Sequence, residues 1–578
     1  MVSNWKTHRH LLVAYLRPQW RGVIILSLLL LGTIALQLVA PQVVRHFIDR
    51  VQSPSPGPLA NIGLLFLVAA LAAQVTGALS VYASERVGWT ATNALRGDLA
   101  LHVLRLDMGV HTARSPGELV ERVDGDVTQL SAFLSQLVIR IIGNVLLLAG
   151  IVVLLYREDW RVGLAYALFT IVALAALRRL LDVAVPHWKE ARQAGAVLLG
   201  FLEERLAGTE DIRSSGAVPY VLRRLTQIMR HQLKTTRRAW FLGSLMWATT
   251  VGLVALGNAL AFGFGAYLLR TDAITIGTIY LFFHYTEMLR RPLELITRQM
   301  QELQRATASV SRVGDLFALR PTEERHAAGL PPGALRLEFR KVGFGYEPDE
   351  PALTDLSFSL EPGRILGLLG RTGSGKTTVG RLISRLYDPA GGTIRLGGAD
   401  VRDLPLAELR ARVGVVTQDV QLFHAPVRDN LTFFDRGVPD ARILAVLEEL
   451  GLRDWLSRLP VGLDSMLDPR AALSAGEAQL LAFARVFFKD PGLVILDEPS
   501  SRLDPLTERL IEDAVARLLR DRTAIIIAHR LATVQRADEI LILEAGQILE
   551  HGPRAALAAD LGSRFAHLLR TGLEEVLA

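Results

Sequence analysis

The feature that most constrains this chain is a series of long uncharged segments within its first 300 residues. Gly22–Val44 runs for 23 residues without a charge and is bracketed by Arg21 and Arg45. At about 1.5 Å per residue, a helix of this length crosses the roughly 30 Å hydrocarbon core of a bilayer. Lipid offers no hydrogen bonds to the backbone, so such a segment can cross it only as a helix.

Five further segments continue the pattern. Pro58–Ser84 and Phe241–Leu269 carry no charge, and Ser131–Tyr156 is interrupted only by Arg140. The last uncharged run is the shortest, because it stops at Thr286, just before Glu287. We predict six membrane helices, at about residues 22–45, 58–84, 131–156, 160–180, 241–270 and 273–300.

Basic residues precede the first of these segments. Lys6, Arg9, Arg17 and Arg21 place the N-terminus in the cytoplasm by the positive-inside rule. The connections at about residues 85–130 and 178–240 are then cytoplasmic, and their length and charge predict helices that extend well beyond the bilayer. The sequence thus predicts a multi-pass protein of the cell inner (plasma) membrane, with the C-terminal half also cytoplasmic.

Composition supports this interpretation. Half of the residues are hydrophobic and the mean hydropathy is +0.29. The net charge of +6 comes mostly from arginines that flank apolar segments, so membrane topology explains it better than a nucleic-acid partner does. The absence of cysteine excludes disulfides, thiolate zinc sites and iron–sulfur clusters.

A change of composition divides the chain. Residues 1–320 form the predicted membrane domain, residues 321–334 a linker rich in Pro and Gly, and residues 335–578 a soluble α/β domain. Short apolar runs in the last part predict buried strands of a parallel sheet. These runs are Ile365–Leu369, Val494–Leu496 and Thr523–Ala528. Leu335–Phe339 and Ser357–Leu360 are also predicted to be strands, and Ala407–Val413 is predicted to be a helix.

A glycine-rich loop follows one of these strands. Gly370–Thr377 matches the phosphate-binding pattern G-x-x-x-x-G-K-[ST] at every fixed position. Its glycines let the backbone wrap phosphate oxygens, Lys376 reaches the terminal phosphates, and the Thr377 hydroxyl is placed to bind Mg²⁺. A glycine-rich turn without a ligand is the alternative, but the strand before the loop and the helical pattern after it favour a nucleoside triphosphate site.

A second motif follows about 120 residues later. Leu493–Glu498 reads LVILDE, four apolar residues and then two acids. A buried strand that ends in Asp497 would bring a carboxylate beside the phosphate loop to hold Mg²⁺. Glu498 would then be available as the general base that polarises the attacking water.

Together with further motifs, these residues carry a family resemblance. Tyr346 precedes the loop, Gln418 lies in VVTQD, Leu473–Gln479 reads LSAGEAQ, Ser501–Asp504 reads SRLD, and His529 follows the apolar run AIIIA. Over essentially its whole length the chain resembles an ATP-binding cassette exporter half-transporter of type IV, the group of multidrug, lipid and peptide exporters. In that family, six membrane helices are fused to one nucleotide-binding α/β domain.

The resemblance implies a role for each matching residue. ATP would be bound by Tyr346, which stacks on adenine, and by Gly370, Arg371, Thr372, Gly373, Ser374, Gly375, Lys376, Thr377, Thr378 and Gln418. Mg²⁺ would be held by Thr377, Gln418 and Asp497, and catalysis would use Glu498 as the base and His529 as the γ-phosphate switch. Ser474, Gly476, Glu477 and Asp504 would complete the ATP site of a partner chain. The alternatives are a packing role for Tyr346, an ordinary surface position for Gln418 and a strand cap for His529.

The signature motif departs from the family's L-S-G-G-Q. Here Ala475 and Glu477 replace a glycine and the glutamine, and an acid near ATP phosphates is disfavoured unless it turns away or is paired. The chain's own hydrolytic half-site is intact, whereas the half-site that would serve a partner is altered. This asymmetry favours a heterodimer with a second half-transporter, and a homodimer is the alternative.

The resemblance implies an ATP-driven exporter of an amphipathic or hydrophobic substrate, a drug, lipid or peptide, in a lipid membrane. The alternative function is a non-transporting member in which ATP gates a channel or senses a ligand. Pro116–Arg122 and Gly208–Ser214 resemble the short helices that dock on the nucleotide-binding domain, or they are solvated turns. Arg140, His284 and Glu287 are intramembrane polar candidates, but Glu287 could reach the interface, and the sequence assigns none of them a substrate role.

Overall fold

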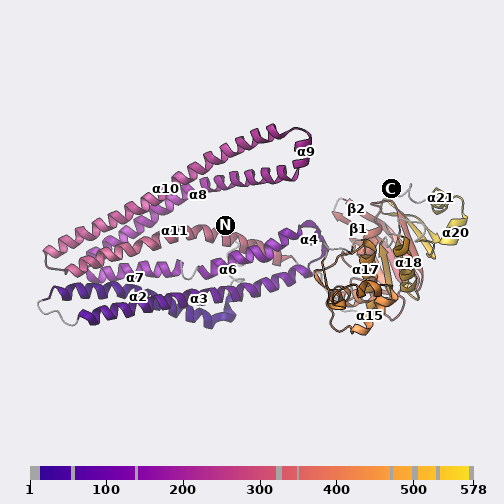
Figure 1. Cartoon of the computed structure of the whole chain (residues 1–578), viewed down its shortest axis with the longest axis horizontal. Helices are drawn as coiled ribbons and strands as arrows, with labels where there is room; N and C mark the ends of the chain where they lie inside the picture. Colours follow the sequence, from indigo (N-terminus) through magenta and orange to yellow (C-terminus); the bar gives the residue numbers. More distant parts are fainter. Residues whose placement is uncertain are drawn as a thin grey trace. The chain divides into compact units, whose positions relative to one another are not determined.

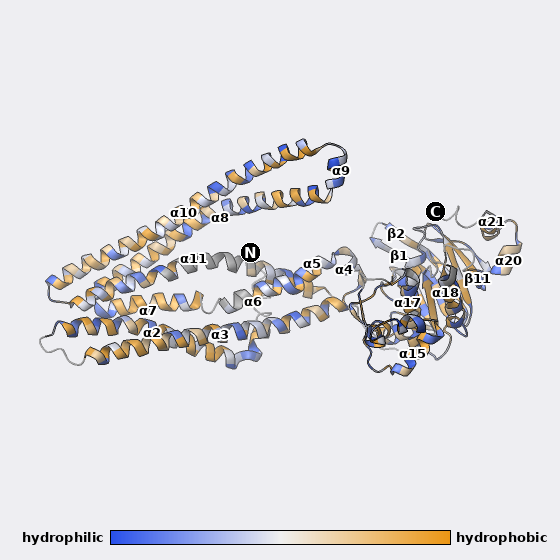
Figure 2. Cartoon of the chain, viewed as in Figure 1, coloured by the Kyte–Doolittle hydropathy of each residue, from blue (hydrophilic) through white to orange (hydrophobic). Residues whose placement is uncertain are grey.

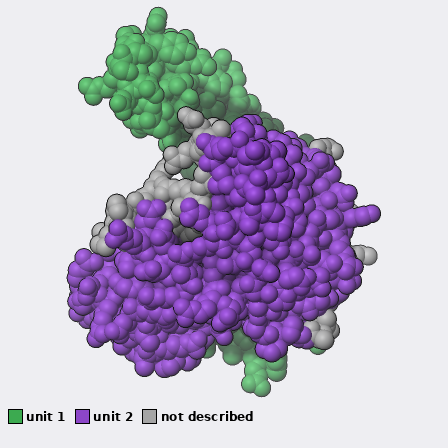
Figure 3. Space-filling view, turned by 90° about the vertical axis from the view of Figure 1, so that its right-hand side faces the viewer, with its two compact units in different colours: residues 1–104, 115–319 green, residues 105–114, 320–578 purple. Residues whose placement is uncertain are grey.

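The structure is a computed structural model that describes residues 13–53, 59–136, 141–319, 329–347, 350–418, 420–468, 473–497, 505–528 and 534–571. It divides into two compact units, which Figure 3 colours separately. The helical unit comprises Met1–Leu104 and Ser115–Leu319, and the α/β unit comprises Arg105–Arg114 and Arg320–Ala578. A helical part joined to an α/β part is the fold class that the sequence predicts, and it is confirmed.

Long helices make up the helical unit (Figure 1). They are α2 (Trp20–Val51), α3 (Leu59–Arg105), α7 (Gly143–Glu158), α8 (Trp160–Ala207), α10 (Val218–Arg270) and α11 (Ile276–Ala318). Shorter elements are η1 (Arg17–Gln19), α5 (Pro116–Val120), the π-helical turn η2 (Glu121–Asp126), α6 (Val127–Gln136) and α9 (Thr209–Ser214). Helices α8 and α10 lie side by side as a long hairpin that α9 closes.

The helices of this unit differ along their length in hydropathy. Figure 2 shows apolar residues along α2, α3 and α7 and hydrophilic ones around α9. Among the described residues, three helical stretches are long and apolar enough by length and composition to cross a membrane: Val13–Val51, Leu59–Arg105 and Val218–Arg270. The other predicted crossings fall on α7, α8 and α11, so the count of six stays a prediction. Arg140 and residues 321–328 of the predicted linker lie outside the described residues.

The sixth predicted crossing, at about residues 273–300, falls on α11. The uncharged run ends at Thr286, but α11 continues without a break to Ala318. Glu287 therefore lies inside a continuous helix, and where the membrane span ends along it stays a prediction.

A buried hydroxyl network holds the centre of the helical unit. The Tyr166 hydroxyl of α8 donates to the carbonyl of Gly257 in α10 over 2.9 Å and lies 2.6 Å from Thr286 Oγ1 in α11. A side chain at position 257 would come within 2.7 Å of the Thr286 methyl group, so glycine is required for this close approach. Three helices are thus fixed to one another at one level.

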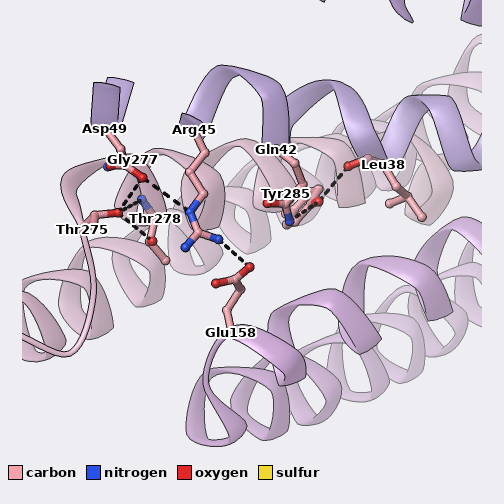
Figure 4. Close-up of polar contacts among 9 residues, drawn as sticks. All are labelled: Leu38, Gln42, Arg45, Asp49, Glu158, Thr275, Gly277, Thr278 and Tyr285. Atoms are coloured by element: carbon pink, nitrogen blue, oxygen red, sulfur yellow. Dashed lines mark hydrogen bonds and ion pairs between the residues drawn. The ribbon is translucent and has the colours of Figure 1, made fainter. Parts of the chain in front are cut away.

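At one end of the unit, polar contacts join three helices (Figure 4). Arg45 of α2 forms an ion pair with Glu158 of α7 over 2.5 Å. Asp49, one turn further along α2, accepts hydrogen bonds from the Gly277 backbone N–H and the Thr275 hydroxyl, each over 3.0 Å. Asp49 thereby places its negative charge at the N-terminus of α11, where the helix dipole favours it.

Far along α11, a buried carboxylate is paired. Asp126 is 2% exposed and accepts hydrogen bonds from Ser309 Oγ over 2.8 Å and from the Arg312 guanidinium through two nitrogens. These hydrogen bonds join the π-helical turn η2 to α11 and thereby fix the position of the turn.

Two sheets form the α/β unit. The four-stranded sheet has the order β2-β1-β4-β5 and the six-stranded sheet the order β12-β11-β3-β10-β9-β6. The strands are β1 (Leu337–Glu347), β2 (Glu350–Leu360), β3 (Ile365–Gly370), β4 (Gly391–Leu396), β5 (Ala399–Asp400), β6 (Val413–Val416), β7 (Ala425–Pro426), β8 (Met466–Leu467), β9 (Leu493–Asp497), β10 (Thr523–Ile527), β11 (Glu539–Glu544) and β12 (Gln547–Pro553). The helices are α4 (Met108–Ala113), α12 (Lys376–Ile383), α13 (Leu406–Arg412), α14 (Val427–Thr432), α15 (Asp440–Glu449), α16 (Arg453–Ser457), η4 (Gly462–Asp464), α17 (Ala475–Lys489), α18 (Pro505–Leu518), α20 (Arg554–Ala559) and α21 (Arg564–Thr571).

The predicted buried strands are confirmed. Strands β3, β9 and β10 pair in parallel, and nearly every residue in them is buried. Continuous apolar runs suit this arrangement because both faces of a parallel sheet are covered. Strand β1 extends eight residues past the predicted Phe339 end, because its later residues alternate between buried and exposed positions as a half-covered strand does.

One of the two predicted docking segments groups with the helical unit, and its docking role stays a prediction. The short helix that groups with the α/β unit is α4, Met108–Ala113, and Pro116–Arg122 stays with the helical unit. Thr112 Oγ1 of α4 lies 3.0 Å from the Tyr387 hydroxyl, which explains the grouping. The Gly208–Ser214 segment does form a short helix, α9, and its docking role stays a prediction.

The Asp126 contacts give a stability prediction. In Arg312→Ala, Asp126 stays buried without its cation, which costs on the order of 3 kcal/mol, so the thermal unfolding midpoint of the purified protein should fall by several degrees. Adding Asp126→Asn to this variant should recover part of the loss, because the amide has no charge to compensate. Arg223→Ala, at an exposed position of α10, is the control. An unchanged midpoint in Arg312→Ala would contradict the assigned role.

Candidate functional site

The carboxyl ends of four parallel strands meet at one edge of the six-stranded sheet. Strand β10 lies between β3 and β9, and the register pairs Ile527 with Leu368 on one side and with Asp497 on the other. On the far side of β9, Leu496 pairs with Val416 of β6. The segments that follow these strands therefore leave the sheet side by side, and a crevice at such an edge is where open α/β sheets bind ligands.

The phosphate loop leaves β3 at this edge. Gly370, Gly373 and Gly375 have φ angles of +149°, +82° and +102°, which L side chains rarely adopt. A side chain at position 375 would lie 2.6 Å from Leu353 Cδ2 and 2.9 Å from the Ala352 carbonyl, whereas nothing lies within 4 Å of a side chain at position 373. The backbone is therefore packed against protein on one side of the loop and open on the other.

Polar groups of the loop suit phosphate. Lys376 opens α12, is 5% exposed, and donates from Nζ to the carbonyls of Gly370 and Arg371 over 2.6 and 2.9 Å. Ser374 is 4% exposed, and its Oγ has no hydrogen-bond partner among the described residues. A buried cation, an unsatisfied hydroxyl and a helix N-terminus in one loop form a site that fits an anionic phosphate chain.

Tyr346 stands at the rim of this site with 44% of its surface exposed. Its hydroxyl lies 3.1 Å from Thr378 Oγ1 and accepts a hydrogen bond from Arg381 over 3.0 Å. The Tyr387 ring meets it edge-on at 5.3 Å between centroids. Such anchoring leaves a ring face available for a flat ligand, and its stacking on adenine stays a prediction. No sequence motif includes Arg381, although it lies one turn after Thr378 on the same helix.

A cavity of about 1570 Å³ joins these parts. Its walls include Tyr346, Lys376, Thr377, Gln418 and Asp497, so the structure brings the described nucleotide and metal candidates together. The described residues contain no group of three or more His, Asp or Glu side chains that could hold a metal ion by themselves. One carboxylate with a hydroxyl and an amide oxygen instead fits Mg²⁺, which keeps waters and phosphate oxygens as its other ligands.

Two basic residues near the cavity have altered acidity. Burial and then repulsion from Arg410 lower the pKa of Lys489, which also lines the cavity. Burial lowers the pKa of Arg485, whose Nε donates to the Asn430 carbonyl over 2.8 Å and whose guanidinium lies 4.6 Å from the centroid of the cavity-lining Phe433 ring. These contacts tie α17 to α14 and to Phe433 at its end, a link that no sequence motif indicates.

Three predicted site residues lie outside the described residues. They are Glu498, Asp504 and His529. Glu498 follows Asp497 directly in the sequence, and His529 comes two residues after Ile527. Their roles stay predictions.

The altered signature has a defined local structure. Ser474 caps α17: its Oγ accepts from the Glu477 N–H over 3.1 Å, and Glu477 Oε2 accepts from the Ser474 N–H over 2.9 Å. This reciprocal pair is a capping box. Arg458 also donates to Glu477 Oε1 over 3.2 Å. The Glu477 carboxylate is therefore paired with a cation and held against the start of its own helix, one of the two conditions under which the sequence allowed an acid there.

Comparisons with known proteins support this description. Residues 353–501 match the family model for the ABC transporter, and residues 23–293 match that for the ABC transporter transmembrane region. A fatty acid ABC transporter ATP-binding/permease protein of Mycobacterium tuberculosis is 31% identical over 508 residues, 86% of this chain and 79% of the relative. An ATP-dependent lipid A-core flippase of Alcanivorax borkumensis is 28% identical, with 96% of each chain covered. The structure of a bacterial Atm1-family ABC exporter with ATP bound superposes with a TM-score of 0.77 at 25% identity, covering 95% of this chain and 98% of the other.

The phosphate loop gives a prediction at Gly375. In Gly375→Ala, the methyl group meets Leu353 and the Ala352 carbonyl and the φ of +102° becomes strained, which together should weaken ATP binding about tenfold or more. Gly398→Ala is a matched control, because its φ is +92° and nothing lies within 4 Å of the added methyl group. It should lower stability slightly and leave ATP affinity unchanged. Fluorescent-nucleotide titration measures both, and equal affinities in the two variants would contradict the prediction.

Proposed function

Since the chain belongs to the ABC transporter family, as an exporter half-transporter with a membrane region fused to an ATP-binding domain, we propose that it exports an amphipathic or hydrophobic substrate by alternating access. One observation carries the proposal. A single chain contains both a unit of long membrane helices and an α/β unit whose cavity is lined by Lys376, Gln418 and Asp497. It is an ABC ATPase that drives transport. What it moves and how its two units work together are parts of the proposal.

The substrate class follows from the relatives and the membrane helices. Two relatives carry names that state a fatty acid and a lipid A-core as cargo, and both molecules combine an apolar body with a polar group. A lipid, fatty acid or drug-like amphiphile therefore fits this chain. The alternative, an ABC protein in which ATP gates a channel, differs in one respect: it would not move a substrate against a gradient when ATP is supplied.

The chemistry of the proposed ATP site rests on this chain's residues. Lys376 and the backbone of the phosphate loop hold the β- and γ-phosphates, and the Tyr346 ring stacks on the adenine ring. Glu498 polarises the attacking water, and His529 contacts the γ-phosphate. Thr377, Gln418 and Asp497 would hold Mg²⁺, which offsets phosphate charge when it is bound.

The proposed partner is a second half-transporter, because Ser474, Gly476, Glu477 and Asp504 would complete an ATP site on another chain. The heterodimer that the sequence favours rested on Ala475 and on repulsion between Glu477 and phosphate. Pairing of Glu477 with Arg458 weakens the repulsion part of that argument, so a homodimer is the direct alternative.

The proposed location is the cell inner (plasma) membrane, with both the N-terminus and the ATP-binding domain in the cytoplasm. The multi-pass character comes from the matched transmembrane region. The orientation rests on the basic residues that precede the first span and flank the cytoplasmic connections.

Removal of the general base tests the ATPase mechanism. Glu498→Gln should keep ATP binding and slow hydrolysis by about 10²-fold or more, since the amide cannot accept a proton from water. Glu544→Gln is the matched control, because this acid ends β11, a parallel strand next to β3. Its turnover should equal that of the wild type. A decrease of less than about threefold in Glu498→Gln would assign the base to another residue.

ATPase activity of the purified chain separates the two oligomers. A heterodimer subunit should be nearly inactive alone and regain activity when it is co-expressed with its partner. Changing Ala475 to Gly and Glu477 to Gln should then affect only the site that this chain completes for the partner. High activity of the chain alone, with two equivalent sites turning over, would instead establish the homodimer.

A further inference from the structure

A polar stripe runs along one face of α11. Tyr280, His284 and Glu287 are spaced by four and three residues, so they share one helix face. All three are partly buried. The Tyr280 and His284 rings stack at 5.6 Å between centroids. The site described above uses none of these residues.

Glu287 lies deep in the predicted bilayer. It comes 11 residues after Ile276, where α11 begins, which is about 16 Å along the helix. Its partner Asn258 comes 12 residues before Arg270, where α10 ends, which is about 18 Å. The short connection between the two helices lies at a membrane surface, so both residues reach roughly the middle of a 30 Å core.

The carboxylate is held by an amide and not by a cation. Asn258 Nδ2 donates to Glu287 Oε1 over 2.7 Å. None of the ion pairs among the described residues includes Glu287. Asn258 Oδ1 is buried and has no hydrogen-bond partner in the described part of the chain. The pair therefore offers a carboxylate and a second oxygen acceptor, and no contact among the described residues gives either of them a cationic donor.

The position of this pair is fixed by its neighbours. Asn258 follows Gly257 and Glu287 follows Thr286, the two residues that the Tyr166 hydroxyl joins over 2.9 and 2.6 Å. The close approach of Gly257 to the Thr286 methyl group brings α10 and α11 together at this level. Preorganisation of this kind reduces the entropy lost when a ligand binds.

The stripe lies on a different side of α11 from the residues of its apolar core, and its side chains are only partly buried. On the opposite side of α11, Leu281, Phe282, Tyr285 and Leu289 are fully buried in the helical unit. Ionisable side chains at membrane depth face protein or a water-filled cavity rather than lipid. In a transporter built from two half-transporters, such a face lines the space between them.

We propose that Glu287 and Asn258 form a substrate site for amphipathic organic cations, which carry a protonated amine on an apolar body. The ammonium would donate to the Glu287 carboxylate and to Asn258 Oδ1, and the aromatic rings of His284 and Tyr280 would lie about one and two turns away along the same face. A buried carboxylate without a cation is costly, and a cationic ligand offsets that cost. This inference rests on the proposed export function and specifies its substrate class.

The experiment uses two probes with the same apolar body. Dansylcadaverine has a primary amine that is protonated at neutral pH, and N-acetyl-dansylcadaverine has no charge. Dansyl fluorescence gives the dissociation constant of each probe for the full-length protein in lipid nanodiscs, with empty nanodiscs as the correction for partition. The wild type should bind the amine about tenfold more tightly than the acetylated probe.

Variants assign that preference to the pair. Glu287→Gln keeps the shape and removes the charge, so the ratio of the two dissociation constants should fall to about one. Glu287→Asp should keep part of the preference. Asn258→Ala leaves Glu287 in place and should reduce the ratio, which provides a second test if the Gln variant does not fold. Glu203→Gln, an exposed acid of α8, is the matched control and should keep the wild-type ratio.

ATP-driven uptake of both probes into proteoliposomes separates failure of this inference from failure of the export function. Uptake of both probes with the same ratio in the wild type and in Glu287→Gln would overturn the cation site and leave export standing. ATP hydrolysis without vectorial uptake of either probe or of a labelled fatty acid would overturn the proposed function itself. Loss of the amine preference in the Gln variant, with the Glu203→Gln ratio intact, supports the site.

Discussion

A bilayer core contains no water to satisfy polar groups, and the structure of the helical unit follows from that constraint. Every backbone group within lipid must bond inside its own helix, and every polar side chain must find a partner nearby. Hydroxyls therefore bond back to their own helix: Thr33, Thr170 and Thr286 donate to the carbonyls of Leu29, Tyr166 and Phe282. The Tyr166 hydroxyl satisfies the same requirement across three helices. The polar groups that remain, above all Glu287, are the ones for which a function has to be sought.

The α/β unit follows a different constraint, the geometry of a parallel sheet. Strands that run in one direction present their carboxyl ends together, so residues separated by more than a hundred positions become neighbours. Because the strand ends lie close together, the phosphate loop needs glycine at position 370: a side chain there would lie 2.3 Å from the Leu543 carbonyl of the adjacent strand. The cavity is thus a consequence of strand order, and its walls are the residues that follow the strands.

In both units, carboxylates are found next to groups that compensate their negative charge. Glu477 is tolerated in the signature because Arg458 and the N-terminus of α17 surround it, and Asp126 is tolerated at 2% exposure because Arg312 and Ser309 bond to it. Among the described residues, the Asn258 amide donates a hydrogen bond to Glu287. The contrast is physically informative, because Asp126 and Glu477 are each paired with an arginine, whereas the contact of Glu287 with Asn258 leaves room for the cationic ligand that we propose.

The sequence alone determined the class of each half and the core of the ATP site. Uncharged runs of more than 20 residues indicate membrane helices. The fixed spacing of residues in Gly370–Thr377 and Leu493–Glu498 indicates a phosphate-binding loop and a pair of acids beside it. Contacts between distant residues were decided only by the tertiary structure. No local pattern reveals that Arg458 reaches Glu477, that Arg381 reaches Tyr346, or that Met108–Ala113 rather than Pro116–Arg122 packs with the α/β unit. Likewise, the charge of Glu287 was the only local marker at the end of the uncharged run, whereas the structure shows that α11 continues past it and that Asn258 of α10 contacts it. The spacing of residues within one segment identifies a motif and its chemistry. Contacts between distant residues depend on how whole helices and strands pack, and that packing is determined by many residues together.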